Sequence, residues 1–255
     1  MHVERTPTEG KYLYGIIRGS PPRVFTNRGV GGRGDPVYTV HAGDLAAIVS
    51  DSPIIEYDQS RRNLLAHTQV QEEVMEQFTI LPVRFGVIAP SAEAIQQKLL
   101  LRQAAELTDI LEQLHGRMEV GVKAFWFEEA IFSEIVASTP PIRELRDSLI
   151  GRSPAESYYE RIRLGEMISA ELTHRRTTDA ELILSRLQPL AEQVQIGAVL
   201  TDRMVVNAAF LLPNERKATF DAAVDTLDAE IGQRMLFKVS TAPPYNFVTL
   251  TINWD

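Results

Sequence analysis

The stretch FKVSTAPPYNFV, from Phe237 to Val248, decides how the end of the chain is organised. A strand-like run from Met235 to Val239 leads into it and stops at the pair Pro243-Pro244, because two prolines remove two backbone donors and fix φ. A semi-rigid arm that carries Tyr245 and Phe247 should follow. We expect this arm either to pack against its own protein or to be offered to a partner.

A second stretch of similar character, TILPVRFGVI, covers Thr79 to Ile88 and predicts a buried strand with Arg84 inside it. The two-residue period of a strand places Arg84 on one face with Pro82 and Gly86, and Phe85 on the other face. A buried guanidinium needs a partner, because an uncompensated one would cost several kcal/mol. Two interpretations stay open: an edge-facing arginine with a structural carboxylate partner, or a recognition arginine on an open sheet face.

Composition limits the class of protein. The 255 residues are 44% hydrophobic and 24% charged, which suits one large or two ordinary globular domains. The net charge is −8 without a basic tract, so we expect no nucleic-acid partner. Cysteine is absent, which excludes disulfides and thiolate chemistry and suits a cytoplasmic protein. We expect no membrane association, because no apolar run approaches the ~20 residues of a spanning helix and Met1 to Gly10 lacks the apolar core of a signal peptide.

Hydrophobic periodicity predicts a first α+β domain over residues 1–117. A glycine-rich and proline-rich loop from Gly19 to Pro36 should follow the first strand. The expected strands are Lys11–Arg18, Val37–Val40, Leu45–Val49 and Leu81–Ile88, and the expected helices run from Ser60 to Phe78 and from Pro90-Ser91 to His115-Gly116.

A second α+β domain is predicted over residues 118–242, with a tail at 243–255 that packs between the domains. Its expected strands are Val120–Phe127, Val194–Leu200, Met204–Leu212 and Met235–Val239. Three helical stretches follow the first strand, with capping sequences at Ser153 and Thr178, and Asn214 should cap a later helix. The order is that of a modified ferredoxin-like fold, βαββαβ, with extra helices in the first crossover.

His67 is the histidine of most interest. Helical spacing places it with Gln71 on the apolar side of the helix that starts at Ser60. It is either a hydrogen-bonded core histidine or a polar spot beneath a domain or partner interface.

No residue set supports catalysis, a cofactor or a metal. The segment Gly29–Gly34, GVGGRG, has the letters of a dinucleotide loop, but such a loop must lead from a strand into a helix. Here Asp35-Pro36 and a strand follow, which favours a flexible loop. The histidines lack metal-ligand spacing, and hydrolase, Walker and kinase motifs are missing. We therefore expect no catalytic, cofactor-binding or metal-binding residues.

Taken in order, the motifs YLYGII, TILPVRFG, VKAFW, NAAFLLP and PPYNFV, with the helix that carries His67, resemble the gas vesicle protein F/L family over nearly the whole chain. The family pattern Gly-Pro-aromatic before Pro-Pro-Tyr is replaced here by Ser240-Thr-Ala.

The resemblance implies two α+β domains, the second a modified ferredoxin-like fold, joined through the tail. It also implies a non-enzymatic assembly protein or minor structural component, located in the gas vesicle and the cytoplasm. Such a protein would bind the small hydrophobic shell protein, gas vesicle protein A, and limit its aggregation during nucleation. Other gas vesicle accessory proteins are the further expected partners, and no small-molecule ligand is expected.

Contact residues do not follow from a motif. The candidates for structural or partner contacts are Arg84, Phe85, His67, Pro243, Pro244, Tyr245 and Phe247. The alternative function, from another class, is a regulatory small-molecule-binding protein built on ferredoxin-like domains. A metabolite that raises the melting temperature would favour that alternative.

Overall fold

The structure, a computed structural model, describes residues 8–19 and 21–254. The chain divides into two compact units: Met1–Glu119 with Thr241–Asp255, and Val120–Ser240. Both combine helices with a β-sheet, so the predicted mixture of helices and sheets is confirmed. The signal-peptide expectation concerns Met1 to Gly10, most of which lies outside the described residues.

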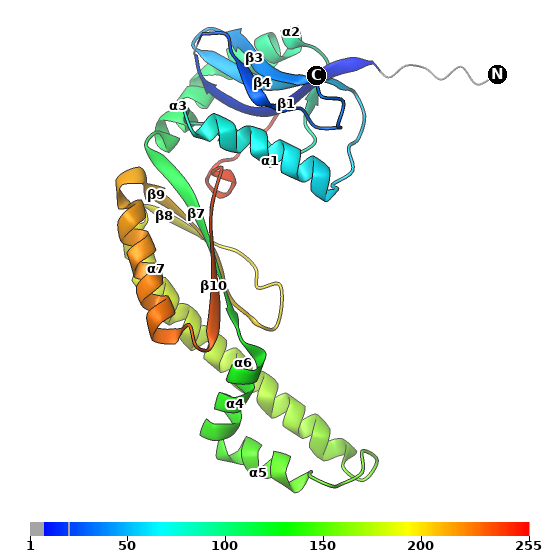
Figure 1. The fold of residues 1–255 in the computed structure, drawn as a ribbon, viewed down its shortest axis with the longest axis vertical. Helices are drawn as coiled ribbons and strands as arrows, with labels where there is room; N and C mark the ends of the chain where they lie inside the picture. The colour runs from blue at the N-terminus through cyan, green and yellow to red at the C-terminus, as the bar shows by residue number, and fades with distance from the viewer. Residues whose placement is uncertain (1–7, 20, 255) are drawn as a thin grey trace, which may run out of the picture. The chain divides into compact units, whose positions relative to one another are not determined.

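The first unit is built on a six-stranded sheet (Figure 1). Its main path is β2-β3-β4-β1-β5, and β6 also pairs with β1. Every side chain of β1 from Tyr12 to Ile17 is buried apart from the glycine, so both faces of the sheet are covered there. The strands are β1 Glu9–Arg18, β2 Val24–Arg28, β3 Pro36–Ala42, β4 Leu45–Pro53, β5 Leu81–Pro82 and β6 Ile88–Ala89.

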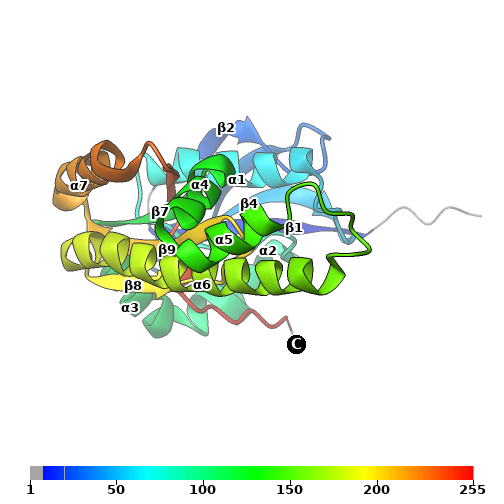
Figure 2. The same cartoon turned by 90° about the horizontal axis from the view of Figure 1, so that it is seen from below.

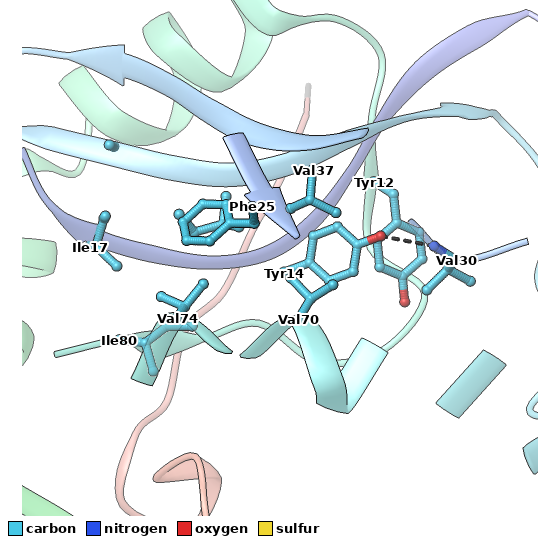
Figure 3. Packing of buried hydrophobic residues seen from close by; sticks show 11 residues of the cluster. Tyr12, Tyr14, Ile17, Phe25, Val30, Val37, Val70, Val74 and Ile80 are labelled. Carbon is cyan, nitrogen blue, oxygen red and sulfur yellow. Dashed lines mark hydrogen bonds between the residues drawn. The ribbon is translucent and has the colours of Figure 1, made fainter. Parts of the chain in front are cut away.

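Helix α1, Arg61–Met75, covers one face of this sheet. Ser60 caps it, since the side chain accepts a hydrogen bond from the amide of Asn63. The core beneath α1 consists mainly of aromatic and β-branched side chains (Figure 3). Within it, the Tyr14 hydroxyl accepts the amide hydrogen of Val30 at 2.9 Å, which holds the loop after β2 in place. The remaining helical segments are α2 Ala92–Ala94, the π-helical η1 Ile95–Leu101 and α3 Ala104–Leu114.

The expected strand Leu81–Ile88 is interrupted, and this corrects the prediction for Arg84. Residues 83–87 form a loop between β5 and β6, because Gly86 adopts a left-handed φ of 91° and Pro82 has no amide to donate. The loop instead bonds to β1: Val83 donates its amide hydrogen to the carbonyl of Tyr14. Arg84 is consequently exposed and does not lie inside a buried strand.

The second unit has a four-stranded sheet in the order β10-β7-β9-β8. Phe210 of β9 packs on Phe220 of α7 with ring centres 5.1 Å apart. The elements are β7 Arg117–Trp126, α4 Glu128–Ser138, α5 Pro140–Ser148, α6 Tyr158–Leu187, β8 Gln193–Ile196, β9 Met204–Pro213, α7 Lys217–Ile231 and β10 Met235–Ala242. Short 3-10 turns occur at η2 Gln188–Leu190, η3 Asn214–Arg216 and η4 Tyr245–Phe247.

Helix α6 is longer than predicted, because Thr178 does not start a helix. Figures 1 and 2 show α6 as one continuous helix with α4 and α5 beside it. Asp179 is buried in the C-terminal third of α6, where its carboxylate accepts hydrogen bonds from Trp126 and Arg234. At the other predicted cap, Ser153 accepts the amide hydrogen of Glu156 at 3.4 Å, but in a turn before α6 begins.

Candidate functional site

The tail, residues 243–254, is anchored in the first unit by a buried polar network. His67 and Gln71 start this network from α1, where a spacing of four residues places both side chains on one face. They are only 3% and 0% exposed. Tyr245 of the tail reaches both of them.

Gln71 holds three groups at once. Its side-chain amide donates to the carbonyl oxygens of Tyr14 at 2.7 Å and Val83 at 3.0 Å. Its Oε1 accepts the hydroxyl hydrogen of Tyr245 at 2.6 Å. A phenol has one hydrogen to donate, so this short bond assigns it and leaves the Tyr245 oxygen free to accept.

His67 supplies the hydrogen that the Tyr245 oxygen accepts. Nε2 lies 3.1 Å from the carbonyl oxygen of Val83 and 3.0 Å from the Tyr245 hydroxyl. A carbonyl can only accept, so Nε2 carries the hydrogen and Nδ1 accepts from the Tyr12 hydroxyl at 3.1 Å. Tyr12 in turn accepts the amide hydrogen of Gly86 at 2.9 Å. The network therefore has a single consistent direction of donation.

Burial sets the charge of the network. Desolvation lowers the pKa of His67 to about 4, against the opposing effect of the Val83 carbonyl. It also raises the pKa of Tyr245 to about 12. At neutral pH both groups are uncharged, so the tail is held by neutral hydrogen bonds in a largely buried site.

A second anchor holds the next residue of the tail. Glu119, 4% exposed, accepts hydrogen bonds from the Asn246 amide nitrogen at 3.0 Å and from its Nδ2 at 2.6 Å. Burial raises the pKa of Glu119, and the two Asn246 donors oppose that rise. Pro243 and Pro244 are buried just before this point and Phe247 is half-buried after it.

The structure brings Phe85 to the network and keeps Arg84 away from it. The ring of Phe85 meets the imidazole of His67 edge-on, with centres 5.7 Å apart. Arg84 faces solvent, and no residue in the ranges 8–19 and 21–254 pairs with its guanidinium.

A pocket of about 290 Å³ lies between the loop after β5 and the tail. Apolar side chains form much of its wall and Arg84 is its charged group. The lining residues are Pro82, Val83, Arg84, Val87, Tyr245 and Val248–Ile252.

The tail beyond Phe247 has free main-chain amides, while the carbonyl oxygens of Thr251 and Trp254 accept hydrogen bonds from Gln103 and Lys98. Val248 has β geometry, with φ −132° and ψ 142°, and Figure 2 shows the segment running on as an extended trace. Among the described residues, the amides of Val248 to Trp254 donate no hydrogen bond to another part of the chain. Such an edge can pair with an added strand.

Comparison with known proteins identifies the family. Residues 10–249 match the family described as Gas vesicle synthesis protein GvpL/GvpF. The chain belongs to the gas vesicle protein F/L family. Gas vesicle protein F of Nostoc sp. is 31% identical over 96% of this chain and 100% of its own length. Gas vesicle protein F of a Streptomyces strain is 35% identical over 93% of this chain and 98% of its own length.

A solved structure supports the fold of this family member. The crystal structure of the gas vesicle protein GvpF from Anabaena sp. superposes with a TM-score of 0.81 at 30% sequence identity. It covers 96% of this chain and 100% of that chain. The expected gas vesicle role is confirmed at the level of the family.

Several site residues of this family member escaped the sequence analysis. Glu119 and Asn246 form the second tail anchor, and a lone carboxylate near the start of an apolar strand was the available signal for Glu119. Asp179 was interpreted as part of a helix start, because Thr-Asp before Ala-Glu is also a capping sequence. Nothing in the described residues groups three or more potential metal ligands, and no described helix is long and apolar enough to cross a membrane.

The buried imidazole predicts a pH dependence of stability. Between the ordinary pKa of 6.5 and the folded value of about 4, the unfolded chain binds a proton at His67 that the folded chain does not. The free energy of unfolding should therefore fall as the pH falls from 6.5 to 4, by up to ~3 kcal/mol at ~1.4 kcal/mol per pKa unit. Urea unfolding at a series of pH values measures this slope.

The variant His67→Gln isolates the contribution of this imidazole to the pH dependence, because glutamine does not titrate. This holds even if the substitution itself lowers stability. Glu119 acts in the opposite sense, since its raised pKa removes stability as the pH rises. The quantity to compare is therefore the slope of unfolding free energy against pH in His67→Gln and in the parent protein. His174→Gln, at an exposed position, is the matched control and should keep the slope. Equal slopes for the parent and His67→Gln would contradict the prediction.

Proposed function

We propose that this gas vesicle protein F/L family member acts without catalysis as an assembly factor or minor structural component. It binds the small hydrophobic shell protein, gas vesicle protein A, and limits its aggregation during vesicle nucleation. It works with other gas vesicle accessory proteins, in the gas vesicle and the cytoplasm. Family membership over nearly the whole chain supports the gas vesicle part of this proposal.

The observation that carries the shell-binding part is the run of free main-chain amides in the tail beside its pocket. Side chains from Val248 to Asn253 alternate between half-buried and exposed, as they do in a strand at the edge of a sheet. Free amides can bond to an added strand, while the pocket beside Arg84 accepts apolar side chains of the incoming segment. This is recognition by strand addition, in which main-chain bonds give affinity and pockets give specificity.

The anchors explain how an exposed edge remains in place. Two hydrogen-bonded anchors, Tyr245 and Asn246, hold the start of the tail before the partner arrives. A pre-positioned strand loses less conformational freedom on binding than a free one would. Covering an apolar partner at its exposed strand edges also removes the surface through which it would aggregate.

Substitution of Ile252 tests the mode of binding. Ile252→Asn adds a polar group to the pocket wall and should reduce capture of co-expressed gas vesicle protein A by about tenfold, since a pocket loses ~1.4 kcal/mol or more when an apolar anchor is replaced. The measurement is a pull-down on the tagged protein, scored for captured and for soluble shell protein.

Ile196→Asn is the matched control. Ile196, on β8, is 62% exposed and does not line the pocket, so the same exchange there should leave capture unchanged. Full capture by Ile252→Asn would reject the pocket as the contact. Absence of capture by the parent protein would reject direct binding to the shell protein.

We further propose that the two compact units are two domains and that the second is a modified ferredoxin-like fold. The strand order β10-β7-β9-β8 supports this, because it places the first and third strands of the unit at the centre. Helices α4, α5 and α6 between the first two strands are the expected enlargement of the first crossover.

A further inference from the structure

The glycine-rich loop after β2 lines a second pocket, of about 280 Å³, on the first unit. The loop forms one wall and the early part of α1 forms the other. Its glycines are followed by β3 and not by a helix, so the dinucleotide arrangement is absent. The lining residues are Arg28, Gly29, Gly31, Gly32, Arg62, Asn63, Leu65, Ala66 and Gln69.

Two arginines bring positive charge to this pocket without a protein partner. Arg28 and Arg62 are both exposed, and within residues 8–19 and 21–254 neither guanidinium group forms a hydrogen bond or ion pair. Arg33 of the same loop differs, because it pairs with Glu9 at 2.9 Å and with Asp35 at 3.1 Å. Of the two arginines that flank the loop glycines, Arg28 and Arg33, only Arg28 therefore lacks a charged partner.

Carboxylates close to the pocket are already occupied. Glu73 of α1 accepts hydrogen bonds from the amides of Thr26 and Asn27 and from the Asn27 side chain. Asp58 accepts a hydrogen bond from Asn63 at 2.7 Å. In a chain with a net charge of −8, two neighbouring arginines with no carboxylate partner are a specific feature and not the result of general basicity.

The glycines bring main-chain donors to the same place. Gly31 and Gly32 have φ of 94° and 72° and are exposed, and their amides donate to no described residue. The Arg62 guanidinium lies 2.5 Å from the place that a Cβ on Gly32 would take, so arginine and loop approach closely, and the positive φ of Gly32 favours glycine there. Main-chain amides and guanidinium groups are the donors with which proteins bind oxyanions.

We propose that this pocket binds the oxyanion group of a small multiply charged molecule, either a phosphate or a carboxylate. Arg28 and Arg62 form the charged hydrogen bonds, and the amides of Gly31 and Gly32 complete the donor set. The site is independent of the tail and of the binding of gas vesicle protein A, so one can fail while the other stands.

Backbone amide NMR spectra of the full chain, titrated with pyrophosphate or with citrate, test the site. We expect the Gly31 and Gly32 amide resonances to shift in a saturable way with at least one of the two anions. Tighter binding of pyrophosphate would identify phosphate as the ligand group, and tighter binding of citrate would identify carboxylate. The spectra also show directly whether each variant is folded.

The double variant Arg28→Gln/Arg62→Gln should bind about tenfold more weakly or worse, since charge-assisted hydrogen bonds are the strong ones. Arg61→Gln is the control: it removes one positive charge at the residue next to Arg62, outside the pocket lining, and should keep its affinity within about twofold. No shift with either anion would overturn the proposal. An equal loss in Arg61→Gln would overturn it too, because that result indicates unspecific attraction to positive charge.

Discussion

Asp179→Ala is expected to destabilise the second unit by ~3 kcal/mol, because it breaks a buried ion pair and leaves its partners unsatisfied. The Asp179 carboxylate accepts from the Trp126 Nε1 at 2.7 Å and from Arg234 at 2.9 and 2.5 Å. The Asp179 and Arg234 side chains are 7% and 18% exposed, so solvent replaces little of what is lost. Arg234 keeps Glu134 at 3.5 Å, which limits the cost.

Urea unfolding followed by the fluorescence of Trp126 measures this effect at the site. The chain has two tryptophans, so a Trp254→Phe background makes Trp126 the single reporter. Asp179→Asn should fall between the parent protein and Asp179→Ala, because it keeps an acceptor for Trp126 but not the charge. Glu166→Ala removes an exposed carboxylate from the same helix and should cost less than ~0.5 kcal/mol. Equal stability of Asp179→Ala and Glu166→Ala would refute the structural role of this cluster.

Tyr245→Ala is expected to release the tail from the first unit. The substitution removes a half-buried ring and the hydroxyl that satisfies Gln71 Oε1 and accepts from His67, a loss of ~3 kcal/mol. Tyr245→Phe keeps the ring but leaves Gln71 without its donor, which should cost ~1.4 kcal/mol. The difference between the two variants separates packing from hydrogen bonding.

The rate of limited chymotrypsin digestion in the tail measures its release from the first unit. Cleavage after Phe247 should accelerate about tenfold in Tyr245→Phe and about a hundredfold in Tyr245→Ala, if cleavage follows the undocked population. Tyr159→Phe makes the same change at a side chain that is 81% exposed and should leave the rate unchanged. Parent-like rates in both Tyr245 variants would show that the hydroxyl and ring do not hold the tail.

Local sequence patterns predicted much of the fold, because hydrophobic periodicity and the residues that end a helix or strand can be recognised from neighbouring positions alone. The break at Pro243-Pro244 and the apolar face of α1 with His67 on its buried side follow from such patterns. The interrupted strand at Arg84 did not, because the bonds that open it come from Tyr12 and Tyr14 on β1. Proline and glycine at positions 82 and 86 were the local signs of that break.

For the candidate site, sequence patterns pointed to individual residues but not to the contacts between them. His67, Phe85 and Tyr245 come together in the first unit, although 178 residues separate the first and last in sequence. No local pattern reveals that His67 meets Tyr245, or that Glu119 meets Asn246, because tertiary packing alone makes these pairs. Asp179 shows the converse: a capping sequence was present, and burial against Trp126 and Arg234 gave the aspartate another role.

Hydrogen–deuterium exchange at the tail, measured with and without bound gas vesicle protein A, tests the central claim most directly. The amides from Val248 to Asn253 donate no hydrogen bond to the described chain, so they should exchange rapidly in the free protein. If the shell protein adds a strand there, alternate amides of this segment should become protected by tenfold or more. Unchanged exchange of the tail in a complex that demonstrably holds the shell protein would contradict the account.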